Sequence, residues 1–95
     1  MNAAEAYAKK IEARLEELDA EIDLMKAKAK GASAEAQLEY TRYLSEMREK
    51  RKEAGRKLEQ LRAAGDNALA DIQAGMENAW KELKGAVDQA KSRFE

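Results

Sequence analysis

The 95-residue chain contains no cysteine, no histidine and no proline, and it has only five glycines. Without cysteine it has no disulfide framework, thiolate nucleophile or sulfur-rich zinc site, and the sequence encodes no redox compartment. Without histidine its carboxylates cannot complete the Glu-x-x-His motif of di-iron helical bundles. Without proline, glycine is the main residue expected to interrupt or end a helix.

The signatures of catalysis are missing too, since the chain has neither a Gly-rich phosphate loop nor a nucleophile elbow. Close pairs of carboxylates are its only approach to an acid–base site, at Glu16/Glu17, Asp19/Asp23 and Glu49/Glu53. On exposed helix faces nothing desolvates these carboxylates, as general acid–base catalysis requires. We therefore expect a protein that is not an enzyme and has no cofactor, no metal and no small-molecule substrate.

Long apolar runs and an excess of one charge are also absent. No segment approaches the roughly 20 apolar residues of a membrane-spanning helix, and the first residues lack the apolar block of a signal peptide. The net charge of -1 gives the whole chain no attraction to nucleic acid or to an anionic membrane. These features predict a soluble, cytoplasmic protein.

One basic run stands out, formed by Arg48, Lys50, Arg51, Lys52, Arg56 and Lys57. Glu49 and Glu53 interrupt it, and no aromatic residue lies among its cations to stack on bases. The run is better explained as a match for the acidic stretch 12–23, so the sequence argues against a nucleic-acid partner.

What the chain does contain is helix-forming sequence, because Ala, Glu, Lys, Leu and Arg dominate and charged residues make up 39% of it. Up to Lys30 the large apolar residues recur at helical spacing: Tyr7, Ile11, Leu15, Leu18, Ile22 and Met25. Gly31 suits the left-handed residue that ends a helix, and Ser33 suits the N-cap of the next. The sequence predicts helices over about 2–30 and 34–63, joined by a tight turn.

These two helices are expected to pair as an antiparallel hairpin, residues 1–63. A turn at 30–33 opposes residues whose numbers sum to about 63. Most opposed charges then have opposite signs, as for Glu12 with Arg51, Arg14 with Glu49 and Glu21 with Arg42. The apolar rows match as well, with Ile22 opposite Tyr40, Leu18 opposite Leu44 and Leu15 opposite Met47. Exposed ion pairs add little stability, but they select the register.

The second region, residues 64–95, carries an eleven-residue repeat: DNALADIQAGM, ENAWKELKGAV and DQAKSRFE. Each block begins with an acid, at Asp66, Glu77 and Asp88. Eleven residues fill three helical turns, which keeps one apolar stripe on one face of an amphipathic helix. We call this set the C-terminal stripe: Leu69, Ile72, Met76, Ala79, Trp80, Leu83, Val87, Ala90 and Phe94.

Two architectures would cover the C-terminal stripe, both of them all-α. In the first, the second helix continues through Gly65 as a tail, and the stripe pairs with other copies. In the second, Gly65 breaks the helix, Asp66 caps a third one, and the chain closes into an antiparallel three-helix bundle. The polar segment 48–57 and the seam that keeps its phase across Gly65 favour the continuous helix, since one glycine costs a helix only about 1 kcal/mol.

The segment AWKELKGAVDQAKSRF, residues 79–94, resembles part of a group of short bacterial coiled-coil proteins. These share an N-terminal helix, a short turn, a charged second helix and a C-terminal Ala-Trp-x-x-Leu-Lys repeat that ends in Arg-Phe or Lys-Phe. The resemblance implies a helical hairpin with a long second helix and no defined biochemical role. The chain departs from the group at two positions. It has Gly65 in place of the usual polar residue, and it has Leu69 where the group often repeats the tryptophan. More distantly, the repeat is similar to that of exchangeable apolipoproteins.

Function is therefore expected to be structural or adaptor-like, with self-association as a dimer or tetramer, or capture of a partner helix, through the C-terminal stripe. Trp80 is the expected anchor of that interface. The alternative is a lipid-surface protein, in which Trp80 and Phe94 would enter a membrane surface. Residues 64–95 carry a net charge of -2, which opposes binding to anionic bilayers.

Overall fold

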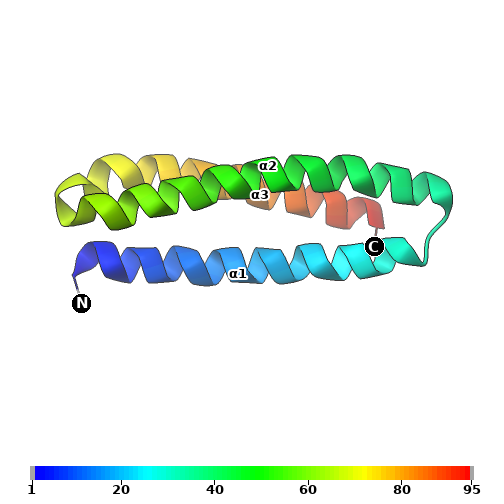
Figure 1. The fold of residues 1–95 in the computed structure, drawn as a ribbon, viewed down its shortest axis with the longest axis horizontal. Coiled ribbons are helices and arrows are strands. Elements are labelled where there is room, and N and C mark those ends of the chain that lie inside the picture. The colour runs from blue at the N-terminus through cyan, green and yellow to red at the C-terminus, as the bar shows by residue number, and fades with distance from the viewer. Residues whose placement is uncertain (1, 95) are drawn as a thin grey trace.

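The computed structural model describes residues 2–94, the side chain of Ala68 excepted, as three long helices packed side by side (Figure 1). They are α1 (Ala3–Lys30), α2 (Ala34–Ala64) and α3 (Leu69–Phe94), with a short 3-10 helix, η1 (Gly65–Ala68), between α2 and α3. The bundle is a rod of 50 × 19 × 17 Å. The expected all-α class is confirmed.

The turn between α1 and α2 forms where the sequence predicts it. Asn2 caps α1 by accepting a hydrogen bond from the Glu5 backbone N–H, and Ser33 caps α2 by accepting one from Ala36. The left-handed conformation expected of Gly31 is wrong, because its φ is -90°. The Gly31 N–H instead bonds to the Lys28 carbonyl, which closes the helix with a tightened last turn.

The favoured continuous second helix is wrong, and the three-helix alternative is the arrangement present. Gly65 has φ 67° and ψ -157°, and α3 returns along α2 (Figure 1). The polar segment 48–57 does not prevent this closure. Ala54 is fully buried there, and Lys57 lies against Gly75 of α3, with its Nζ, Cε and Cδ atoms 3.7, 3.8 and 3.9 Å from the position that a Cβ on Gly75 would occupy. The side chain of a long basic residue can thus cover part of the surface of a neighbouring helix.

The hairpin of α1 and α2 forms, but its ion pairs differ from the predicted ones. Arg51 pairs with Asp19 at 2.9 Å, and Glu12 pairs with Arg62 at 2.6 Å. Acids recur along this flank of α1 at 12, 16, 19 and 23, so a charge pattern alone fits more than one register. Close to the turn one predicted pair is in contact, since the Tyr40 hydroxyl lies 3.5 Å from the Ile22 carbonyl.

One apolar core runs along the axis and takes residues from all three helices. Its large members with less than 2% exposure are Ile11, Leu15, Met47, Leu61, Met76, Leu83 and Val87. No polar side chain among the described residues belongs to the buried class. The stability of the fold therefore rests on apolar burial, and polar contacts lie along the edges where the helices meet.

Candidate association site on the third helix

The structure places the C-terminal stripe inside the protein's own bundle. Met76, Leu83, Val87 and Ala90 have 0% exposure, and Ala79 has 6%. The other members, Leu69, Ile72, Trp80 and Phe94, are partly buried against the same core. The structure thus brings all nine predicted residues together on one face, but α1 and α2 of the same chain cover that face. In the closed bundle the stripe is not a free surface.

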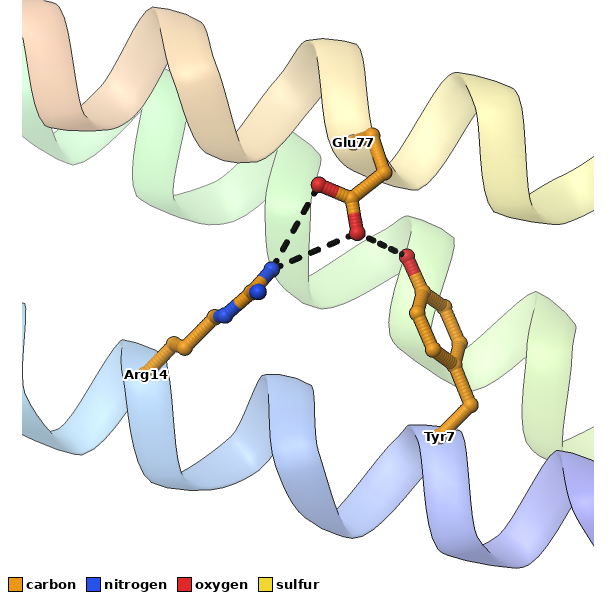
Figure 2. Close-up of polar contacts among 3 residues, drawn as sticks. All are labelled: Tyr7, Arg14 and Glu77. Atoms are coloured by element: carbon orange, nitrogen blue, oxygen red, sulfur yellow. Dashed lines mark hydrogen bonds and ion pairs between the residues drawn. The ribbon is translucent and has the colours of Figure 1, made fainter.

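A polar cluster fixes the α1 edge of α3 (Figure 2). The Tyr7 hydroxyl donates a hydrogen bond of 2.7 Å to Glu77 Oε1, and Arg14 Nη1 lies 3.3 and 3.4 Å from the two Glu77 oxygens. Tyr7 and Arg14 stand on one side of α1, two turns apart, and Glu77 reaches between them from α3 (Figure 2). The cluster therefore ties the two helices at one defined register.

The electrostatics of this cluster favour a charged Glu77 and a neutral Tyr7. The hydrogen bond from Tyr7 lowers the pKa of Glu77 below its ordinary 4.5, and the charges of Arg14 and Lys10 lower it further, against the opposing effect of burial. Burial raises the pKa of Tyr7, and so does its hydrogen bond to Glu77. Both shifts keep the partners in the protonation states that hold the hydrogen bond near neutral pH.

Trp80 extends the cluster toward the middle of the bundle. The Arg14 guanidinium carbon lies 5.0 Å from the centre of the Trp80 ring, within the range of a cation–π contact. The indole Nε1 is buried and makes no hydrogen bond to any of residues 2–94. Trp80 therefore serves the closed bundle through the face of its ring, which Arg14 covers, rather than through its polar atom.

Asp66 performs a different task from the expected one. Its Oδ1 accepts a 2.7 Å hydrogen bond from the Ala4 backbone N–H, so it caps the first turn of α1 instead of the third helix. A carboxylate at a helix N-terminus also interacts favourably with the helix dipole. The connection from α2 to α3 is thus held against the start of α1.

The far end of α3 is fixed by rings and charges. Phe94 makes edge-to-face contacts with Tyr40 and Tyr43, at centroid distances of 5.7 and 6.0 Å. Nearby, Arg93 Nη2 donates a 3.0 Å hydrogen bond to Glu39 on α2, and Lys91 lies 3.6 Å from Glu21 on α1. The orientation of α3 is therefore specified at both ends of its length.

One feature of the sequence marks the polar cluster, although helical periodicity alone does not show it. The acids that open the first two blocks, Asp66 and Glu77, both point to α1, whereas Asp88 pairs within α3 with Lys84 at 2.8 Å. An acid recurring every eleven residues beside an apolar stripe marks the edge that faces a neighbouring helix. The position of Tyr7 is that of an ordinary apolar residue between two helices. The partner of Arg14 can be assigned only when the position of the third helix is known.

Within residues 2–94, no group of three or more acidic side chains converges in a way that could hold a metal ion. None of the helices described combines the length and apolar character needed to cross a bilayer. Comparison of the chain with protein-family models, curated proteins and solved structures finds no match.

Proposed function

We propose that this chain is a non-enzymatic structural or adaptor protein that self-associates through α3. The observation that supports this function is the construction of α3 itself. It presents one uninterrupted apolar stripe to a groove between two helices, and polar contacts at Glu77 and Arg93 set its direction and register. These are the properties of a helix built to recognise a specific helical groove.

The polar cluster supports association rather than catalysis. Glu77 is engaged by both Tyr7 and Arg14, and the Arg14 guanidinium also lies over Trp80. Each charged group is thus used for contact between helices, and the carboxylate is held in the form that accepts hydrogen bonds. A general acid–base residue needs instead a proton that is free to exchange with a substrate.

Light scattering on a sizing column, from micromolar to millimolar protein, tests the proposal. We expect the molar mass to rise with concentration from that of one chain to that of a dimer or tetramer. Trp80→Ala should lower the free energy of unfolding while the far-ultraviolet circular dichroism stays helical, because the ring packs against Arg14 of α1 in the folded chain. Lys81→Ala, at an exposed neighbouring position, is the matched control and should leave the free energy of unfolding unchanged. A single-chain mass at every concentration would refute self-association.

A further inference from the structure

We infer that two copies of the chain associate by exchanging α3, with Gly65 as the hinge. In this dimer α2 and α3 form one continuous helix, and the α3 of each copy lies in the α1–α2 groove of the other. The inference rests on the proposed function, because it names a second copy as the partner of α3. It also explains how the C-terminal stripe can be both a core face and an interface.

The hinge is a single residue in a short connection. Gly65, at φ 67° and ψ -157°, is the one residue between 2 and 94 with a positive φ, and glycine alone adopts this region readily. Its neighbour Ala64 and the first residue of α3, Leu69, already have helical angles. A rotation centred on Gly65 therefore converts the turn to helix, and short constrained connections of this kind favour exchange between copies.

The apolar pattern is continuous across the hinge. Leu58, Leu61, Gly65, Ala68 and Ile72 follow one another at steps of three and four residues. When the helix is straight, the buried faces of α2 and α3 thus merge into one stripe. The continuous helix would span about 60 residues and about 90 Å at 1.5 Å per residue. Two such helices can run antiparallel, each covering the other's hairpin.

The polar contacts select a second copy of this chain over an unrelated helix. An occupant of the α1–α2 groove must present an acid to Tyr7 and Arg14, and an aromatic ring to Tyr40 and Tyr43. It must also place cations opposite the acids Glu21 and Glu39. The α3 of another copy satisfies all these requirements at once, with the contacts that it makes in the closed bundle.

Replacement of Gly65 tests the hinge. Gly65→Ala disfavours the positive φ of the closed turn and favours helix at the same residue, so both effects act toward the dimer. Because each dimer has two hinges, we expect the dimerisation constant to rise by about a hundred-fold or more. Gly85→Ala is the matched control, since Gly85 lies within α3 and an added Cβ meets no atom within 4 Å. It should leave the constant nearly unchanged.

Cross-linking between separate chains tests the exchange itself. The chain has no cysteine of its own. One preparation carries Glu21→Cys and the other Lys91→Cys, at positions whose native side chains lie 3.6 Å apart between α1 and α3. The two are unfolded together, refolded at millimolar concentration and treated with a short bis-maleimide. Exchange predicts covalent heterodimers carrying one chain of each kind, in a yield that Gly65→Ala increases and Gly85→Ala does not.

The outcomes separate this inference from the proposed function. A dimer by light scattering that gives no heterochain cross-link would overturn the exchange and leave self-association standing. A single-chain mass for both wild type and Gly65→Ala at millimolar concentration would overturn both. Circular dichroism of each variant ensures that a monomeric result comes from folded protein.

Discussion

The hydroxyl of Tyr7 and the carboxylate of Glu77, 70 positions apart in the sequence, are joined by a hydrogen bond of 2.7 Å between α1 and α3. Arg14 completes the contact from the same side of α1 (Figure 2). The two helices are parallel in the bundle and have no direct connection in the chain. This contact therefore reports on the docking of α3 against α1.

Removing the hydroxyl should weaken that docking without changing the core. Tyr7→Phe keeps the ring and deletes the hydrogen bond, so we expect the free energy of unfolding to fall by about 0.5–1.5 kcal/mol. Urea unfolding at one fixed protein concentration measures the change. Tyr43→Phe is the control, because the Tyr43 hydroxyl makes no hydrogen bond within the described residues. Equal losses in the two variants would contradict the role given to Tyr7.

The charge of Glu77 should make stability depend on pH in the acid range. Its pKa is lowered in the folded protein by the Tyr7 hydrogen bond and the nearby cations. Its stabilising effect is thus present above the ordinary pKa of 4.5 and is lost as the pH falls through the lower folded value. The stability difference between wild type and Glu77→Gln should be up to about 1 kcal/mol at neutral pH, given partial exposure, and should shrink as the pH falls below the ordinary pKa of 4.5.

The matched control for this pH effect is Asp88→Asn, which alters the repeat acid that does not face α1. Asp88 forms an exposed pair with Lys84 within α3, and such pairs contribute little. Urea midpoints of all three proteins, measured between neutral and acid pH, give the comparison. A difference between wild type and Glu77→Gln that stays constant over this range would show that the carboxylate charge does not hold α3.

Two leucines, one buried and one exposed, test which residues form the core. Leu83 in the C-terminal stripe has 0% exposure, and Leu38 on α2 has 69%. Leu83→Ala should lower the free energy of unfolding by about 2–5 kcal/mol through lost burial and a cavity. Leu38→Ala should change it by less than about 0.5 kcal/mol. Chemical denaturation checks both, and a small effect of Leu83→Ala would mean that the stripe does not form the core.

The helices and the first turn could be predicted from the sequence because their signals are local. Asn2 and Ser33 are caps that act within three residues, and the apolar spacing of each helix is visible in one window. The C-terminal stripe was identifiable for the same reason. Its burial in the structure agrees with its periodicity.

The partner of the stripe could not be predicted, because it depends on one residue and on long side chains. A helix through Gly65 and a turn at Gly65 differ by little in local free energy, and the apolar phase fits both. The segment 48–57 is rich in charged residues, yet Ala54 is buried in the core and the Lys57 side chain lies against Gly75 of α3. Tertiary contacts such as Asp66 with Ala4 decide the outcome, and no local pattern contains them.

Trp80, the single tryptophan of the chain, provides a direct test of the lipid alternative. In the closed bundle its ring is partly buried beneath Arg14, and the rest of the C-terminal stripe faces α1 and α2. Residues 64–95 also carry a net charge of -2, which opposes approach to an anionic surface. We therefore expect neutral and anionic vesicles to leave the Trp80 emission maximum unshifted. Arg14→Ala, which uncovers one face of the ring, is the control that shows the emission responds to its surroundings. A blue shift of the wild-type protein on vesicles would instead indicate that α3 leaves the hairpin for lipid, and would replace self-association with a membrane-surface function.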